Sequence, residues 1–183
     1  MSTIPNEEKL PPEISQIQES ISTKKYGIAV EHTIHFLNGT LKQNNNDNLS
    51  IGLDILYAIC DKSKQTIEIT LDIIRTLLDH SEYWVRQDAL NILKKIYLIR
   101  PDKFDPLIEK IESKLFDSDK KVRESAVMLI ETILKRSMDL YPELYLSYAR
   151  MFEDTSWTVR AKALQGVLSF ISRESKPPTG MIE

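Results

Sequence analysis

An internal repeat with a period of 37 residues constrains the fold of this chain more than any other feature. The dipeptide Val-Arg occurs at 85–86, 122–123 and 159–160, and no insertion changes the spacing. The surrounding stretches are alike: LLDHSEYWVRQDALNILKKI, LFDSDKKVRESAVMLIETIL and FEDTSWTVRAKALQGVLSFI. A fixed period of about 20–50 residues is typical of repeat proteins, in which each unit packs on its neighbours. The sequence therefore predicts a stack of similar units.

Two sets of apolar positions recur in each unit, and both have helical spacing. The earlier set has apolar residues at relative positions 0, 4, 7 and 11 and begins with Val30, Ile67, Phe104 and Tyr141. The later set begins with a column of small residues, Gly52, Ala89, Ala126 and Ala163, and continues with apolar residues one, four and seven positions further on. Such spacings place apolar side chains on one face of a helix. Each unit is thus predicted to be a helical hairpin, with an Asp- and Ser-rich turn that caps its second helix.

The repeat also predicts the organisation of the chain. Four units are expected, at about residues 24–61, 62–98, 99–136 and 137–172. Before them, three isoleucines at helical spacing follow Pro11 and Pro12 and predict an N-terminal capping helix over 11–23. Residues 1–10 and 173–183 are expected to be disordered, since Pro177 and Pro178 prevent a helix from continuing through the latter segment.

Composition agrees with helices joined by short turns and excludes other classes. Five glycines in 183 residues are few for a β-sandwich or a nucleotide-binding fold. A net charge of −3 gives no general attraction to a polyanion. Cys60 is the single cysteine, so neither an intramolecular disulfide nor a multi-cysteine metal cage is expected. Without a signal peptide or a long apolar run, we expect a cytoplasmic chain that does not insert into a membrane.

The motif within each unit resembles that of a known repeat family. An Asp-rich turn precedes Val-Arg, and a small residue follows three positions after the Arg; the match is clearest at 117–126 and 154–163. These features resemble the HEAT-repeat family over about residues 24–172, with adaptin-like and condensin-type arrays nearest in texture. The resemblance implies an all-α fold, a right-handed α-solenoid of about four HEAT-like hairpins with an added N-terminal capping helix.

The resemblance also implies a structural role for the Asp and Arg columns. In such repeats these columns usually form a ladder of hydrogen bonds and ion pairs between neighbouring turns. The members here are Arg86, Arg123, Arg160, Asp117 and Asp154. A row of three arginines that binds phosphate is the alternative interpretation.

Motifs for catalysis are absent from the sequence. It contains no phosphate loop, no nucleophile elbow and no HExxH zinc motif. His32 and His35 could face the same way on a helix, but no third metal ligand is evident. No catalytic residue, metal site or cofactor is therefore predicted, and Cys60 is interpreted as a small core residue.

Candidate binding residues are aromatic, basic and apolar side chains at positions where the repeat varies. They are Tyr83, Trp84, Trp157, Lys94, Lys95, Lys120, Lys121 and Leu168. Aromatic side chains at a rim are favoured binding anchors, although packing of each turn on its neighbour is the alternative. Leu168 stands where other copies have Lys94 and Glu131, which predicts a contact with a partner or with a second copy of the chain.

We therefore expect a non-enzymatic scaffold or adaptor that presents a curved helical surface to a partner protein. This expectation follows from the fold by analogy, and the sequence does not identify the partner. The alternative is a nucleic-acid-associated HEAT protein, condensin-like or DNA-repair-like, that binds through local basic patches. That alternative requires a continuous basic face, whereas the column of Lys94 continues with Glu131 and Leu168.

Overall fold

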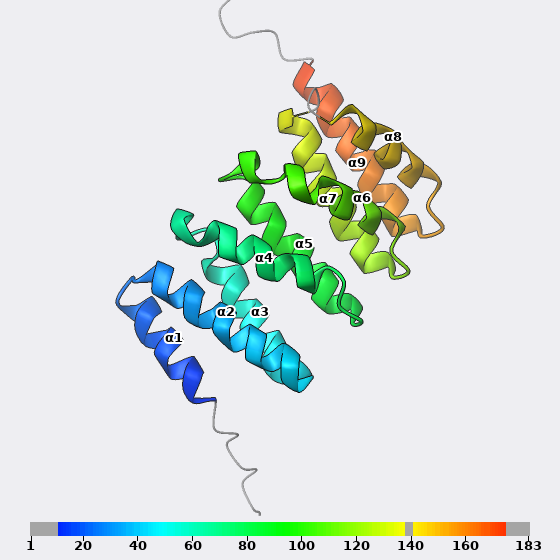
Figure 1. Cartoon of the computed structure of the whole chain (residues 1–183). Coiled ribbons are helices and arrows are strands. Elements are labelled where there is room, and N and C mark those ends of the chain that lie inside the picture. Colours follow the sequence, from blue (N-terminus) through cyan, green and yellow to red (C-terminus); the bar gives the residue numbers. More distant parts are fainter. Residues whose placement is uncertain (1–10, 138–140, 175–183) are drawn as a thin grey trace, which may run out of the picture. The chain divides into compact units, whose positions relative to one another are not determined.

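The computed structural model describes residues 11–137 and 141–174, without the side chains of 137, 142 and 170–174. This part of the chain consists of helices and connecting turns, with no strand, which confirms the all-α prediction (Figure 1). Disorder is predicted for 1–10 and 173–183, of which 1–10 and 175–183 lie outside the described residues. Residues 173 and 174 instead continue the last helix, which ends at Glu174. None of the described helices is long and apolar enough to cross a membrane.

First and second helices alternate along the chain in the order that the repeat predicts. The α-helices are α1 (Pro12–Ser22), α2 (Tyr26–Gln43), α3 (Asn46–Ile59), α4 (Ile67–Leu77), α5 (Tyr83–Tyr97), α6 (Ile108–Ser113), α7 (Lys120–Ser137), α8 (Pro142–Arg150) and α9 (Trp157–Glu174). Short 3-10 helices are η1 (Lys64–Thr66), η2 (Pro101–Lys103), η3 (Asp105–Leu107), η4 (Lys114–Phe116) and η6 (Met151–Glu153). The bounds of the four predicted units stay a prediction from the repeat.

The connection between α2 and α3 is shorter than expected. The segment KQNNNDN at 42–48 is rich in polar residues, which predicts an expanded turn between the two helices of the first hairpin. In the structure, however, α2 reaches Gln43 and α3 begins at Asn46. Asn44 adopts a left-handed conformation with φ 52°, which asparagine tolerates better than most residues. The Asn45 side chain accepts a hydrogen bond from Asn48 N at 3.0 Å and caps α3. Two asparagines thus form the whole turn.

The chain divides into two compact units, residues 1–73 and 74–183, and each is described by itself. In the first unit α2 packs against both α1 and α3. Its core contains Ile14, Ile17 and Phe36. The small-residue column has a clear steric reason here, because a Cβ on Gly52 would lie 2.6 Å from a methyl group of Leu37. A glycine at this position allows α3 to approach α2 closely.

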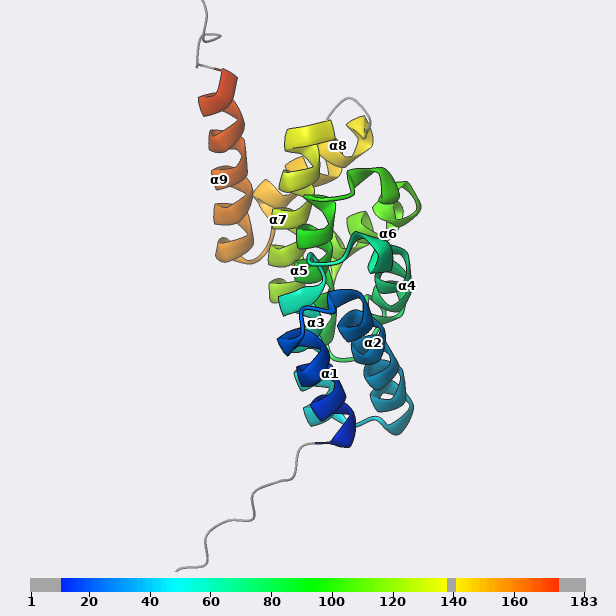
Figure 2. The same cartoon turned by 90° about the vertical axis from the view of Figure 1, so that its left-hand side faces the viewer.

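In the second unit the second helices α5, α7 and α9 follow one another, with α7 in contact with both others (Figure 2). The small residues Ala89, Ala126 and Ala163 are completely buried. The phenol of Tyr97, at the end of α5, donates to the Ile133 carbonyl of α7 at 3.4 Å. Successive second helices packed in this way are the arrangement of an α-solenoid.

The first helix of the third predicted unit departs from the regular pattern. The columns predict one helical face through Phe104, Ile108, Ile111 and Leu115. In the structure α6 has only six residues, between the 3-10 helices η3 and η4. Pro106 lies in η3 and has no N–H to donate within a regular helix. All four apolar side chains are nevertheless buried, so the packing pattern persists where the α-helix is interrupted.

Candidate functional site

Arginine and aspartate side chains join neighbouring turns along one edge of the second unit. Nε and Nη2 of Arg86, on α5, donate to the carboxylate of Asp117 at 2.8 and 2.7 Å. Arg123, on α7, makes the same two-point contact with Asp154 at 2.7 and 2.9 Å. The side chains are 11% and 7% exposed in the first pair and 12% and 6% in the second. The structure thus brings together two pairs of the predicted ladder with bidentate geometry, which favours strong charge-assisted hydrogen bonds.

Each arginine also holds the turn that precedes its own helix. In all three copies Nη1 donates to the backbone carbonyls of the residues five and six positions earlier. One guanidinium group therefore ties its own turn to the next one. Among the described residues, Arg160 makes only the contacts with its own turn, in which Nη1 donates to Asp154 O at 2.7 Å and to Thr155 O at 3.2 Å. No carboxylate in the described part of the chain accepts from its Nε or Nη2.

The aspartates of the ladder are held in the charged state. Oδ1 of Asp117 also accepts from Asp119 N at 2.9 Å, and the corresponding atom of Asp154 accepts from Ser156 N at 2.7 Å. Burial raises the pKa of Asp117, but the hydrogen bonds from Arg86 and Asp119 N and the charge of Arg86 outweigh burial. The net result is a pKa below the ordinary value. The same balance lowers the pKa of Asp154.

These contacts bear on the alternative that the three arginines bind phosphate. A phosphate group would have to replace a carboxylate at Arg86 and at Arg123, since both are engaged through Nε and Nη2. Such an exchange would leave a buried carboxylate without its partner, which is costly. The geometry therefore favours the structural ladder over a phosphate row.

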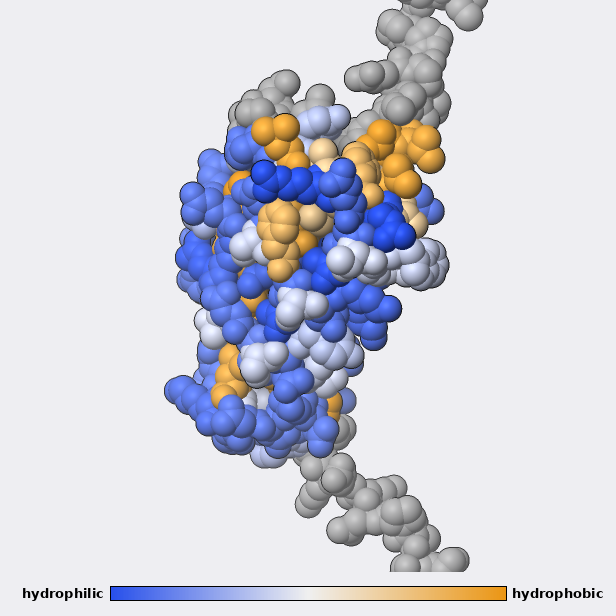
Figure 3. All heavy atoms as spheres, turned by 90° about the vertical axis from the view of Figure 1, so that its right-hand side faces the viewer, coloured by the Kyte–Doolittle hydropathy of each residue, from blue (hydrophilic) through white to orange (hydrophobic). Residues whose placement is uncertain are grey.

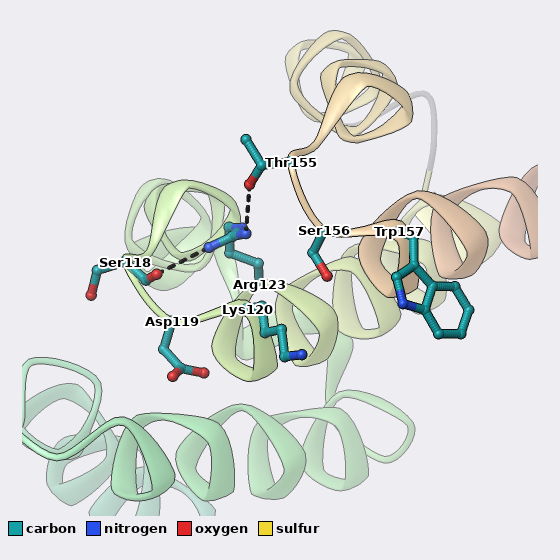
Figure 4. Close-up of a pocket in the computed structure, with 7 residues that line it drawn as sticks. All are labelled: Ser118, Asp119, Lys120, Arg123, Thr155, Ser156 and Trp157. Atoms are coloured by element: carbon teal, nitrogen blue, oxygen red, sulfur yellow. Dashed lines mark hydrogen bonds between the residues drawn. The ribbon is translucent and has the colours of Figure 1, made fainter.

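A hollow of about 540 Å³ lies beside the second of these pairs (Figure 4). Its lining comes from the turns before α7 and α9 and from the first turns of these two helices: Ser118, Asp119, Lys120, Arg123, Thr155, Ser156 and Trp157. Trp157, the first residue of α9, is 70% exposed. Lys120 is exposed and makes no ion pair with any described residue. The hollow therefore offers an indole ring and an ammonium group to a ligand.

Another aromatic residue, two repeats before Trp157, lies on the same edge. Tyr83 begins α5 and is 36% exposed. The ammonium group of Lys121 lies 5.4 Å from the centroid of its ring, a cation–π distance. Trp84 is partly buried, so it has less surface for a partner than Trp157 has. We call Tyr83, Lys120, Lys121 and Trp157 the turn edge.

Lys94 and Lys95 do not belong to the turn edge. They lie near the other end of α5, and at about 1.5 Å per residue Lys94 is about 16 Å along the helix from Tyr83. Both side chains are partly buried. The next column position on α7, Glu131, pairs with Lys135 and accepts from Ser169 Oγ at 3.1 Å. No continuous basic stripe follows from these lysines.

Leu168, the last of the predicted binding residues, lies on α9 and is 65% exposed. Leu164, one turn earlier on the same helix, is 54% exposed. Sequence reasoning placed Leu164 in a core column with Leu90 and Val127, both of which are completely buried. Among the described helices, none packs on α9 as α7 packs on α5 and α9 packs on α7, so Leu164 stays exposed.

The sequence analysis also missed polar contacts between successive hairpins. Asp79 forms ion pairs with Lys110 and, at 3.3 Å, with Lys114. Hydrogen bonds from both lysines and their charges lower the pKa of Asp79. Three further side-chain hydrogen bonds join residues 34 to 36 positions apart: Tyr141 to Asp105, Ser147 to Glu112 and Thr158 to Glu124. A separation close to the repeat period could have suggested these pairs.

In the described segments, no group of three or more His, Cys, Asp or Glu side chains is placed to hold a metal ion. Cys60 is buried, and its thiol donates to the Tyr57 carbonyl at 3.7 Å, in agreement with its interpretation as a core residue.

Stacked helical hairpins whose turns are joined by arginine–aspartate pairs define a HEAT-like α-solenoid protein. The family described as Adaptin N terminal region matches residues 17–175, and the chain belongs to this family. Over 79 residues the chain is 33% identical to the AP-3 complex subunit delta-1 of Bos taurus. That match covers 43% of this chain and 6% of the bovine protein. The resemblance to adaptin-like HEAT arrays is therefore confirmed.

Proposed function

We propose that this chain is a non-enzymatic, cytoplasmic protein-binding adaptor that engages a partner protein through the turn edge. Membership of the adaptin N-terminal family supports the adaptor role, and the similar bovine protein is, by its name, a subunit of a complex. The observation that carries the proposal is the 70% exposure of Trp157 beside the hollow. An exposed indole next to charged groups is a typical binding anchor, since it buries a large area with few rotatable bonds.

The chemistry of the turn edge indicates the kind of segment it would bind. The guanidinium group of Arg123 is occupied by Asp154, so Lys120 supplies the available positive charge in the hollow. A peptide with an apolar side chain next to a carboxylate would place the first on Trp157 and the second on Lys120. Contacts at such an exposed rim are screened by salt, so binding should weaken at high ionic strength.

The test is a pull-down with the full chain from its native cells, followed by crosslinking mass spectrometry. Trp157→Ala and Lys120→Glu should each lower recovery of the partner at least about tenfold, the factor that corresponds to about 1.4 kcal/mol. Leu146→Ala is the matched control, because Leu146 is 68% exposed on α8 outside the turn edge. Circular dichroism confirms that each variant folds.

Two results would contradict the proposal. Unchanged recovery with both turn-edge variants would show that the partner binds elsewhere. Recovery of nucleic acid alone, lost at high salt, would favour the nucleic-acid alternative.

A further inference from the structure

The outward side of α9 carries apolar side chains at a position that the preceding second helices bury. Leu90 on α5 and Val127 on α7 are completely buried, whereas Leu164, in the same column, is 54% exposed. The next second helix packs on α5 and on α7 in turn. Figure 3 shows apolar side chains, coloured orange, gathered over α9 at the upper right of the view. We call Arg160, Leu164 and Leu168 the α9 outer face; their spacing of four residues puts them on one side of the helix.

Arg160 adds a specific charge requirement to this apolar face. Arg86 and Arg123 each pair with an aspartate 31 residues later, in the turn before the next second helix. Arg160 holds its own turn as they do, through Nη1 to two backbone carbonyls. Its guanidinium group is therefore already oriented by those contacts, while no described carboxylate accepts from Nε and Nη2. The arrangement fits one carboxylate that approaches both nitrogen atoms.

We propose that the α9 outer face docks a helical hairpin of a partner protein, with an aspartate in the turn before the helix that packs on α9. The aspartate accepts hydrogen bonds from Nε and Nη2 of Arg160. The helix that follows it covers Leu164 and Leu168. This inference goes beyond the proposed function, since it concerns a second surface and names the class of partner.

Two other occupants fit the face less well. The segment 175–183 contains Pro177 and Pro178, so it cannot supply a two-helix hairpin. A second copy of the chain has aspartates in the turns before its second helices at Asp79, Asp117 and Asp154. All three are already paired, Asp79 with two lysines and the others with arginines of the same copy. Its first unit has Asn45 in the corresponding turn, where the side chain caps α3 and carries no charge.

A chimera tests the chemistry of the face. A second copy of residues 137–173 is joined after Arg173, which keeps the 37-residue period and puts the copied Asp154 at the ladder spacing from Arg160. The added hairpin should raise the melting temperature of the chain. Arg160→Gln, and the change of the copied aspartate to asparagine, should each remove part of the rise, and together they should remove no more than either alone. Additive effects, or no rise at all, would overturn the inference.

Photo-crosslinking identifies the occupant in native cells. A crosslinking amino acid at position 164 or 168 of the full chain should capture peptides from a helical hairpin that has an aspartate in its turn. Arg160→Gln should lower the yield about tenfold, equivalent to about 1.4 kcal/mol. Crosslinks to residues 175–183, to a second copy, to lipid or to nothing would each overturn the inference. Lys120→Glu should leave this crosslink intact, which separates failure here from failure at the turn edge.

Discussion

The pair between Arg123 and Asp154 allows the ladder to be tested quantitatively. Arg123→Gln removes two charge-assisted hydrogen bonds to Asp154 and two bonds to backbone carbonyls of its own turn. Removal of one partner of a fully buried ion pair costs about 3–5 kcal/mol. The side chains here are 12% and 6% exposed, so water partly compensates the remaining carboxylate. We expect Arg123→Gln to lower the free energy of unfolding by about 2–3 kcal/mol, which is less than the cost for a fully buried pair and more than the cost for an exposed pair.

The assay is urea unfolding followed by circular dichroism, with Arg100→Gln as the matched control. Arg100 also makes a two-point contact with an aspartate, Asp102, at 2.8 and 2.7 Å. Its side chain is 32% exposed and that of Asp102 is 58% exposed. Water screens the attraction between charges that are this exposed, so the control should lose little stability.

A double-mutant cycle with Asp154→Asn isolates the pair. The coupling energy between Arg123 and Asp154 should be about 1–3 kcal/mol, as for residues in one hydrogen-bonded network. Equal losses for Arg123→Gln and Arg100→Gln, or a coupling energy near zero, would refute the ladder as a source of stability.

The remaining predictions concern acid stability, helix packing and fluorescence. The pKa of Asp154 is lowered in the folded state, so the stability that its charge contributes is present above the ordinary pKa and is lost as the pH falls through the lowered pKa. Acid unfolding of Asp154→Asn should therefore show a shallower loss of stability below about pH 4 than the unmodified chain shows. Gly52→Ala should destabilise by about 1–2 kcal/mol through overpacking against α2, whereas Gly39→Ala, with open space around the new Cβ, should stabilise by about 0.5–1 kcal/mol; equal urea midpoints would contradict this. Trp157→Phe should remove the red-shifted part of the tryptophan emission and leave the blue-shifted emission of the partly buried Trp84, and an unchanged spectrum would contradict the exposure of Trp157.

The repeat made the helices and two of the ladder contacts predictable from sequence. A period of 37 residues relates each turn to the next, so Arg123 and Asp154 could be expected to meet once both lie in neighbouring turns. The columns of small and apolar residues likewise predict which faces pack. The packing faces follow from spacing alone, whereas the ladder role of the Asp and Arg columns is what the resemblance to HEAT repeats implies.

Features that depend on the neighbouring helices, and not on the spacing within one repeat, could not be predicted in the same way. Leu164 and Leu90 occupy equivalent columns, yet only Leu90 is covered, because coverage comes from the next helix. The ion pairs of Asp79 with two lysines of the next hairpin vary between copies, so no column marks them. Pro106 signals the interruption before α6, but the column pattern does not show how much α-helix survives it.

The two-point contacts of Arg86 with Asp117 and of Arg123 with Asp154 have a mechanical consequence for the second unit. A carboxylate held by two nitrogen atoms cannot slide along or twist away from its partner without breaking both bonds. Neighbouring turns are therefore held by two bonds each at one end of the second helices. At the other end α5 and α7 are joined by single hydrogen bonds, from Tyr97 to Ile133 O at 3.4 Å and from Arg136 to Leu98 O at 2.9 Å. A load on these hairpins should open the end that carries Tyr97 first and keep the distance between Tyr83 and Trp157 constant. A partner bound at the turn edge would thus find its contact residues at a constant spacing while the other ends of the helices separate.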